Sequence, residues 1–559
     1  MSKLAWMALS AFLCACGSDA VSDVPDEGSG GATTAGAGGS GGATTSFGLD
    51  VAWEDCPLRT GGGGPLKSAQ CATIEVPLHW DEPAGRKIEL FLKRYGATPE
   101  ASTRQLWLLA GGPGQPGVGF EGLAEQVASA APTMSFYMLD HRGVGRSTRL
   151  GCPAEEAIDS DGSIQITVDE MPACLAHVRG TFDDAALTGF STTEAAHDVG
   201  ELIAHLRRAD ETSMVWGGSY GTHWANRYAQ LYPSQSEAIV LGALAINNEL
   251  ARIDGRFGAL ALAYLERCQI GPCGDAFAAA FGGQTAPDVA IDLLRGSGKT
   301  LCPELEAEGW EVRSLKVFFG SVLYDWNARK LIPPLVYRAA RCSPDDVAVF
   351  AHLAGVLTAP VATIPPAQRL WGMFITHHVI KSELWTDPPL TATELQSIEE
   401  EALAINGTSA LLLPSYEQWP RYPRPDIAYG SPSGRVLMVH GELDFTPSAL
   451  YQPAVDHYLG LRDDNRFFLL PRAPHGLAGP TTTGVNCGPW LEWHFAKDPT
   501  AEPTDCGPDI LPLDFVPDAN LSMGYLGTAD PWDGAVVDTL APAPPPSLVE
   551  VRARFLRRR

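Results

Sequence analysis

The sequence predicts an α/β fold, a mostly parallel sheet flanked by helices, with an inserted helical cap between two parts of that sheet. From residue 49 to about residue 245, short apolar runs alternate with helical patterns, as expected for parallel strands joined by crossover helices. Strand patterns then stop until after Gly430, where two more follow. The chain has 559 residues and is 45% hydrophobic, so it can bury a large core.

The first part of the predicted sheet begins with a hairpin over residues 73–78 and 87–93, which are rich in branched side chains. Short apolar runs that end at or near a turn residue indicate buried parallel strands, and they lie at residues 105–110, 135–139, 213–216 and 238–241. A capping residue and apolar spacings of three and four predict a helix over residues 192–206. A second helix is predicted over residues 222–231, stopped by Pro233.

The middle of the chain breaks this alternation. Residues 245–428 are mostly amphipathic helix, for example at 257–268 and 334–341, and strands resume at 435–439 and 466–470. We therefore expect a sheet-containing core in two pieces, a cap between them and a C-terminal tail that is first packed and then mobile. The predicted ranges are 49–244 and 429–510 for the core, 245–428 for the cap and 511–559 for the tail.

The N-terminus has the pattern of a targeting segment. Lys3 precedes an apolar stretch that is too short to span a membrane and suits a signal peptide. The stretch ends in Leu-Cys-Ala-Cys, which resembles a bacterial lipobox and implies cleavage after Ala15 and acylation of Cys16. An ordinary secretory signal is the alternative. Residues 1–16 would then be the signal, and residues 17–48, made mainly of Gly, Ser, Ala and Thr, a disordered tether. This pattern predicts an exported, lipid-anchored protein of the bacterial cell envelope, with the outer membrane favoured.

The charge balance limits the possible partners. There are 40 Lys and Arg against 66 Asp and Glu, for a formal net charge of −26. Nucleic acid is a poor partner for so acidic a chain, because its binding depends on neutralising phosphates. Apart from a short basic C-terminus, no polybasic segment is available for anionic lipid, so the expected membrane contact is the lipid anchor only.

The cysteine count agrees with export. Without Cys14 and Cys16, ten of the 12 cysteines remain, and an even number in an exported chain predicts disulfides. Sequential pairing is expected because each such pair closes a short loop. No Cys-x-x-Cys motif exists, so no metal site is predicted. The candidates are Cys56, Cys71, Cys152, Cys174, Cys268, Cys273, Cys302, Cys342, Cys487 and Cys506.

A candidate nucleophile lies between a predicted strand and a predicted helix. Residues 217–221 read Gly-Gly-Ser-Tyr-Gly, a G-x-S-x-G motif in the strand–turn–helix setting that it requires. The glycines permit a sharp turn that exposes the hydroxyl of Ser219, and the following helix N-terminus favours a developing anion.

A serine nucleophile needs a base and a group that orients the base. In this motif's setting the expected chain order is Ser, acid, His. Asp444 follows one late strand and His475 follows the next, so both should reach the same sheet edge as Ser219. Glu442 is the alternative acid and His440 the alternative base.

The oxyanion hole requires two backbone N–H groups. Tyr220, directly after the nucleophile, is expected to supply one. The sequence Gly-Gly-Pro-Gly at 111–114 follows an early strand, and Gly112 is expected to supply the other because its missing side chain lets substrate approach.

These motifs together resemble the α/β-hydrolase superfamily, and within it the secreted proline iminopeptidase and tripeptidyl aminopeptidase family. The matching strings are GGPG (111–114), DHRGVGRS (140–147), GGSYGT (217–222), GELDFTP (441–447) and APHG (473–476), and they lie within a resemblance that runs from about residue 50 to 508. Many iminopeptidases carry His before GGPG, whereas this chain has Ala110, which favours the tripeptidyl branch. Asp140 and Arg142 are expected to hold the loop beside the site.

The resemblance implies a serine exopeptidase that releases residues from free peptide N-termini without a metal or organic cofactor. It also implies a cap carboxylate that binds the substrate amine, and Glu383 matches that region. Two alternatives remain open. An esterase or lipase-like hydrolase would use the same triad, and a non-catalytic binding lipoprotein would use the fold alone.

Overall fold

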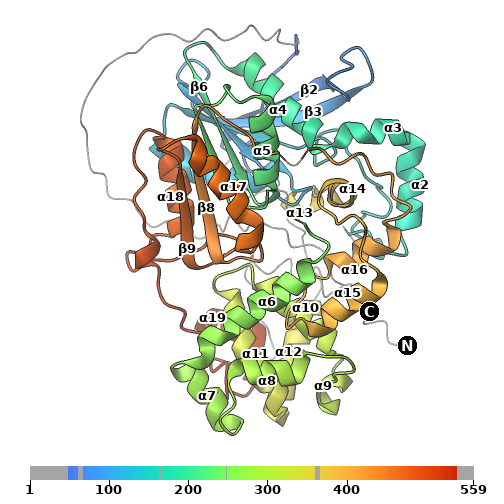
Figure 1. Ribbon diagram of the computed structural model, residues 1–559, viewed down its shortest axis with the longest axis vertical. Coiled ribbons are helices and arrows are strands. Elements are labelled where there is room, and N and C mark those ends of the chain that lie inside the picture. The colour runs from blue at the N-terminus through green and yellow to red at the C-terminus, as the bar shows by residue number, and fades with distance from the viewer. Residues whose placement is uncertain are drawn as a thin grey trace.

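The computed structural model describes residues 48–60, 67–162, 165–246, 249–358, 366–426 and 428–537. Nine strands form one sheet in the order β1-β2-β3-β5-β4-β6-β7-β8-β9 (Figure 1). They are β1 Glu54–Pro57, β2 Ser68–Pro77, β3 Lys87–Gly96, β4 Arg104–Leu109, β5 Met134–Leu139, β6 Thr212–Gly218, β7 Ala238–Gly242, β8 Arg435–Leu443 and β9 Arg466–Pro474.

Helices surround this sheet and fill the segment between β7 and β8. Those outside that segment are α1 Glu121–Val127, α2 Met171–Thr181, α3 Asp184–Leu187, α4 Thr192–Leu206, α5 Tyr220–Leu231, α17 Ser448–Leu461, α18 Cys487–Lys497 and α19 Ala519–Leu526. Those between β7 and β8 are α6 Ile253–Glu266, α7 Pro272–Ala280, α8 Ala286–Leu294, α9 Pro303–Ala307, α10 Val312–Val322, α11 Ile332–Arg341, α12 Pro344–Thr358, α13 Pro366–Arg369, α14 Met373–Glu383, α15 Ala392–Glu401 and α16 Thr408–Leu412.

The α/β fold class predicted from the sequence is confirmed. Strands β5, β4, β6, β7, β8 and β9 are neighbours in parallel pairs, and β2 and β3 form the expected antiparallel hairpin. The helix predicted over residues 192–206 is α4, with the same bounds. Strand β1 was not predicted, because its four residues carry no apolar alternation and only pairing with β2 extends them.

Both faces of the central strands are buried. In β4, Leu106 and Leu108 belong to one apolar cluster, while Trp107 and Leu109 belong to the other. This alternation places successive side chains on opposite sides of the sheet. Helices α1 and α18 contribute to the face of Leu106 and Leu108, and helices α4, α5 and α17 contribute to the face of Trp107 and Leu109. The parallel strands are therefore covered by helices on both sides.

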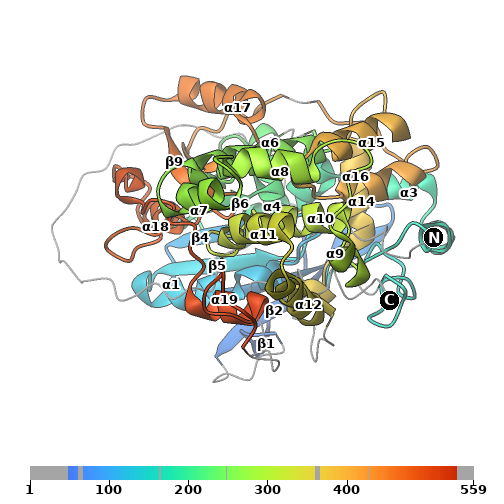
Figure 2. The ribbon, with the colours of Figure 1, turned by 90° about the horizontal axis from the view of Figure 1, so that it is seen from below.

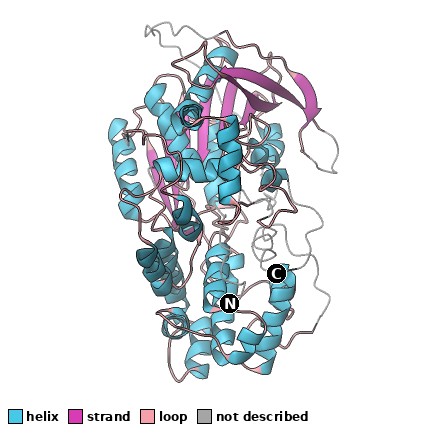
Figure 3. Ribbon diagram, turned by 90° about the vertical axis from the view of Figure 1, so that its right-hand side faces the viewer, coloured by secondary structure: helices cyan, strands magenta, loops and turns pink. Residues whose placement is uncertain are grey.

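In the described residues, the chain between β7 and β8 contains helices and no strand. Most of these helices, α6 to α12, gather below the sheet in Figure 1, and Figure 3 shows the strands confined to the other half of the molecule. Figure 2, viewed from below, shows α6, α8, α10 and α11 lying across the end of the sheet. The exact boundaries of a separate cap remain a prediction.

The tail after residue 510 packs against the helical segment. Helix α19 contacts α12, as seen in Figures 1 and 2. Arg338 of α11 is fully buried, and it donates to the backbone oxygens of Pro531 and Gly534. It also pairs with Asp346 at 2.9 Å, so the tail closes over a buried ion pair. The end that was predicted to be mobile lies, after residue 537, outside the described residues.

Five disulfides form between neighbouring cysteines in the chain, so the predicted sequential pairing is confirmed. The pairs are Cys56–Cys71, Cys152–Cys174, Cys268–Cys273, Cys302–Cys342 and Cys487–Cys506. Such a set favours an oxidising compartment.

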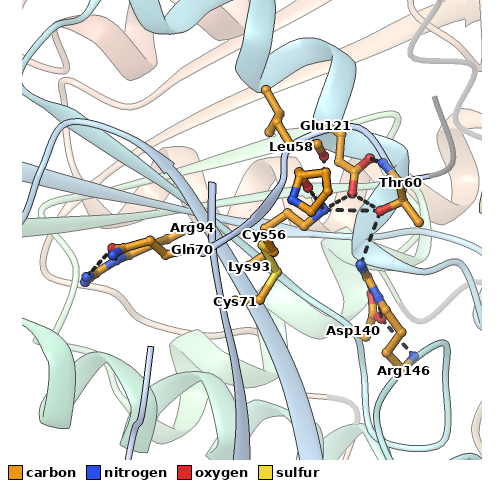
Figure 4. The surroundings of a disulfide bond; sticks show 11 residues. Cys56, Leu58, Thr60, Gln70, Cys71, Lys93, Arg94, Glu121, Asp140 and Arg146 are labelled. Carbon is orange, nitrogen blue, oxygen red and sulfur yellow. Dashed lines mark hydrogen bonds and ion pairs between the residues drawn. A yellow bond between two sulfur atoms is a disulfide. The ribbon is translucent and has the colours of Figure 1, made fainter. Parts of the chain in front are cut away.

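The first disulfide joins β1 to β2 beside a buried ion pair (Figure 4). Lys93 Nζ lies 2.5 Å from Glu121 Oε1 and 3.1 Å from Thr60 Oγ1. Burial lowers the pKa of Lys93, and Glu121 opposes this shift. The segment before β2 is thus fastened to the sheet by a covalent bond and by an ion pair.

The two disulfides within the helical segment should differ in their effect on stability. Cys302 and Cys342 are 40 residues apart, whereas Cys268 and Cys273 are 5 apart. A longer closed loop restricts the unfolded chain more, so replacing Cys302 and Cys342 by Ser should cost about 4 kcal/mol and replacing the other pair about 2 kcal/mol. Guanidinium unfolding of both variants under non-reducing conditions would measure this. A larger loss from the short-loop pair would contradict the loop-entropy explanation.

The predicted signal, with Cys16, and the predicted tether up to residue 47 lie outside the described residues. Within the described part of the chain, no helix has an apolar stretch of the length needed to cross a bilayer.

Candidate active site

Ser219 lies at a sharp turn between β6 and α5. Its φ is 55° and its ψ is −124°, a conformation that non-glycine residues rarely adopt. A Cβ at Gly221 would collide with the carbonyl of Leu109, and one at Gly217 with the carbonyl of Gly221. The glycines are therefore required by close backbone approach, and the turn is the nucleophile elbow predicted from the sequence.

The three residues predicted as a triad lie in hydrogen-bond contact. His475 Nε2 is 2.8 Å from Ser219 Oγ, and His475 Nδ1 is 2.6 Å from Asp444 Oδ2. Asp444 directly follows β8 and His475 directly follows β9, and these strands are parallel to β6 through β7. Their carboxyl ends therefore meet at the edge where the elbow lies.

The surroundings of Asp444 keep it ionised. Burial alone would raise its pKa, but His475, His440 and the N–H of Thr446 outweigh this, and the pKa lies below its usual value. The Thr446 N–H donates to Oδ1 at 2.7 Å, which leaves Oδ2 for the imidazole. The rings of Phe445 and Tyr324 pack against His475, with centroids 4.4 and 5.8 Å away.

The alternative acid, Glu442, and the alternative base, His440, have other hydrogen-bond partners. Glu442 pairs with Arg267 at 2.7 Å and accepts the N–H of Arg472, so it joins the helical segment to β9. His440 Nε2 contacts the carbonyl of Thr446, and its Nδ1 lies 3.8 Å from Asp444. Among the described residues, His475 is the histidine that is hydrogen-bonded to Ser219.

The predicted oxyanion loop lies against the nucleophile. A Cβ built at Gly111 would lie 3.2 Å from Ser219 Cβ, so the loop approaches the elbow as closely as a glycine allows. Gly112 has a φ of 107°, and Tyr220 begins α5. The assignment of their N–H groups as the oxyanion donors stays a prediction.

Several contacts around this loop were not predicted. The hydroxyl of Tyr220 lies 2.7 Å from Thr192 Oγ1 and 3.4 Å from His141 Nε2. The Gly117 N–H donates to Asp140 at 2.8 Å, which fits the expected loop-holding role of Asp140. Arg142 instead binds Asp198 through two N–H groups, at 2.6 and 2.7 Å, and so joins the loop to α4. The string DHRG signalled this neighbourhood but not these partners.

Glu383, which the resemblance predicts to bind the substrate amine, is buried in this structure and is held by three neighbours. It is 2% exposed. Its oxygens accept from the Thr192 N–H at 2.9 Å and the Tyr422 hydroxyl at 2.5 Å, and lie 3.1 Å from His223 Nε2. Burial raises its pKa, but these partners together hold it below the usual value. The carboxylate therefore joins α14 to α4 and α5.

Buried histidines predict a loss of stability in mild acid. Burial lowers the pKa of His141 and His378 to about 4, and it also lowers the pKa of His377 and His440. Below about pH 6.5 these histidines are protonated in the unfolded chain but stay neutral in the folded chain. The free energy of unfolding therefore falls as the pH drops towards 4.

Each of the two histidines with a pKa near 4 should cost about 2 kcal/mol at pH 5. Asp254, whose pKa burial raises to about 6, acts in the opposite direction but offsets only part of the loss. Urea unfolding at pH 7 and pH 5 would measure the difference, and equal stability at both would contradict this account.

Two separate clusters of side chains in the described residues could each offer ligands to a metal ion. One comprises Cys302, Glu304 and Cys342, but its cysteines form a disulfide. The other comprises His79, Asp81 and Glu194. Neither group contains a triad residue.

The fold and the site define an α/β-hydrolase with the triad geometry of a serine hydrolase. Comparison with known proteins refines this class. No protein-family model matches the chain. It is 27% identical over 209 residues to the tripeptidyl aminopeptidase of Streptomyces lividans, which covers 35% of this chain and 38% of that protein.

Two mycobacterial proteins match as well. Identity is 27% over 216 residues to the serine protease Hip1 of Mycobacterium tuberculosis H37Rv, covering 35% of this chain and 39% of that one. It is 28% over 145 residues to carboxylesterase B of the same organism, covering 24% and 26%. The chain therefore matches well under half the length of these relatives.

Among solved structures, a proline iminopeptidase from Mycobacterium smegmatis is similar with a TM-score of 0.28 and 15% identity, over 72% of this chain and 91% of that one. The strand order and the elbow, rather than this likeness, define the fold. Together, the motifs and the curated relatives confirm the resemblance to the proline iminopeptidase and tripeptidyl aminopeptidase family.

Proposed function

We propose that the protein is a serine exopeptidase that releases residues from free peptide N-termini, with the tripeptidyl type favoured over the prolyl type. The observation that carries the proposal is the position of His475 between Ser219 and Asp444, at 2.8 and 2.6 Å. The printed names of two matched relatives, a tripeptidyl aminopeptidase and a serine protease, support peptide as the substrate.

In this mechanism Ser219 Oγ attacks the scissile carbonyl carbon while His475 Nε2 takes the hydroxyl proton. Asp444 orients the imidazole and stabilises the imidazolium that forms. The backbone N–H groups of Gly112 and Tyr220 bind the oxyanion of the tetrahedral intermediate. His475 then gives the proton to the leaving amine, and water hydrolyses the acyl-enzyme by the same steps in reverse order.

An esterase is the second candidate, because one matched relative is named a carboxylesterase. The triad would serve ester and amide alike, so the substrate class depends on the surfaces that contact the acyl and leaving groups. A non-catalytic binding lipoprotein would need none of the contacts between Ser219, His475 and Asp444.

We also propose that the protein acts outside the cytoplasm, held at the cell envelope by a lipid on Cys16. Five disulfides support export. Mass spectrometry of the native N-terminus would test the anchor, and an unmodified Cys16 would rule it out.

The function is tested by comparing kcat/KM on four substrates: a chromogenic tripeptide amide, its N-acetylated twin, a prolyl amide and a short p-nitrophenyl ester. Much faster cleavage of the free-amine peptides supports the exopeptidase, and the better of the tripeptide and prolyl substrates gives its type. Turnover of the ester alone would replace the peptidase by an esterase.

A further inference from the structure

The loop beside the nucleophile contains a buried side-chain amide whose oxygen has no hydrogen-bond partner among the described residues. Gln115 follows Gly114 and is 7% exposed. Its Oε1 accepts no hydrogen bond from any described residue. Leaving a buried acceptor unsatisfied costs about 1–3 kcal/mol, so such a group in a folded protein requires an explanation.

This oxygen and the elbow lie against the same glycine, Gly111. A Cβ built at Gly111 would lie 3.5 Å from Gln115 Oε1 and 3.2 Å from Ser219 Cβ. Gln115 Oε1 and Ser219 Cβ therefore both lie close to Gly111. Because Gly111 has no side chain, it does not separate them. The other end of the amide lies near Gly119, where a Cβ would be 2.9 Å from Gln115 Nε2.

The backbone on both sides of Gln115 is held in place. Before it, the hydroxyl of Thr376 donates to the Pro113 carbonyl at 2.6 Å, and the Gly372 N–H donates to the Gly114 carbonyl at 2.9 Å. After it, the Gly117 N–H is bound by Asp140. An acceptor on so constrained a loop is preorganised, and binding a donor there orders little new structure.

We propose that Gln115 Oε1 is a substrate-binding group that accepts a hydrogen bond from an N–H on the acyl part of the substrate. The donor is either the terminal ammonium or an amide N–H of the peptide. The inference rests on the proposed peptidase function, because a simple carboxylic ester carries no N–H there. It assigns to Gln115 a role in recognising an N–H group on the amine side of the substrate.

The proposal has a direct consequence for specificity. A site built around an unpaired acceptor discriminates against substrates that lack the matching donor, because the acceptor then stays unsatisfied in the complex. Gln115 would favour acyl groups derived from amino acids over simple aliphatic acyl groups.

The test uses the full chain with Gln115→Met, which keeps the length and shape of the side chain and removes the acceptor. The substrates are a tripeptide p-nitroanilide with a free amine, its N-acetylated twin and p-nitrophenyl butyrate. We expect the ratio of kcat/KM on the free-amine peptide to that on the ester to fall about tenfold or more. Gln70→Met is the control: its amide binds Arg94 on the distant hairpin (Figure 4), and the ratio should not change.

Gln115→Glu restores an acceptor and should recover most of the peptide activity. If the ammonium is the donor, the added charge also widens the preference for the free amine over the acetylated twin. If an amide N–H is the donor, both peptides respond equally.

An equal loss on peptide and ester would overturn the proposal, since it would indicate a general role in the loop. So would an unchanged ratio in Gln115→Met. If that variant does not fold by circular dichroism, Gln115→Ala replaces it with the same expectation. Failure of the wild-type protein to cleave any peptide would instead reject the proposed function, which the wild-type rates show separately.

Discussion

Ser219→Ala is expected to lower kcat on any cleaved substrate by about 10⁴- to 10⁶-fold while the protein stays folded. The hydroxyl is the atom that forms the bond to the acyl group, and the residual rate would come from binding and the oxyanion hole alone. Among the described residues the hydroxyl is hydrogen-bonded to His475, so its removal costs that hydrogen bond. Steady-state kinetics, with thermal unfolding in parallel, would measure both effects.

Ser213→Ala is the matched control. Ser213 lies on β6, the strand that leads to Ser219, and is equally buried, but its hydroxyl donates to the Gln235 carbonyl and accepts from Arg207. Its loss should affect stability slightly and activity little. Hydrolysis that survives in Ser219→Ala at more than a few per cent would mean that another nucleophile acts and that the elbow has been misassigned.

The triad could be predicted because a few local rules determine it. Parallel strands end at one sheet edge, so residues just after β6, β8 and β9 must lie near one another whatever the intervening chain does. A G-x-S-x-G turn marks the first of them. Chain order disfavours His440, which precedes both candidate acids, but it does not separate Asp444 from Glu442. The contact with Ser219 distinguishes the histidines, and the contact with His475 then distinguishes the acids.

The environment of the site could not be predicted in the same way. Glu383 contacts Thr192 and His223, which lie 191 and 160 positions earlier in the chain. No local sequence pattern indicates that these residues meet. Gln115 is similar, because its lack of a partner depends on how the helical segment and the elbow enclose the loop. Periodicity identifies helices α6 and α11 as amphipathic but does not reveal what they cover.

Asp444→Asn is expected to lower kcat by about 10⁴-fold, with little effect on KM. The amide keeps the shape of the carboxylate but can present an N–H to His475 Nδ1, which favours the tautomer that cannot accept the proton of Ser219. It also removes the charge that stabilises the imidazolium. Because Asp444 has its pKa lowered by its partners, its carboxylate is ionised throughout the neutral range in the wild-type protein. Kinetics between pH 6 and pH 9 would measure the loss.

Glu442→Gln tests which of two nearby carboxylates, Glu442 or Asp444, is the acid of the triad. Its carboxylate binds Arg267 and the N–H of Arg472, so the neutral amide should loosen the contact between the helical segment and β9 without changing the charge on His475. A loss of less than about tenfold is expected, because this ion pair is partly exposed and such pairs contribute little. Should Glu442→Gln prove as damaging as Asp444→Asn, the acid of the triad would have to be reassigned. Should Asp444→Asn retain most of the activity, the observed contact between Asp444 and His475 would be structural, and His475 would need another partner to orient it.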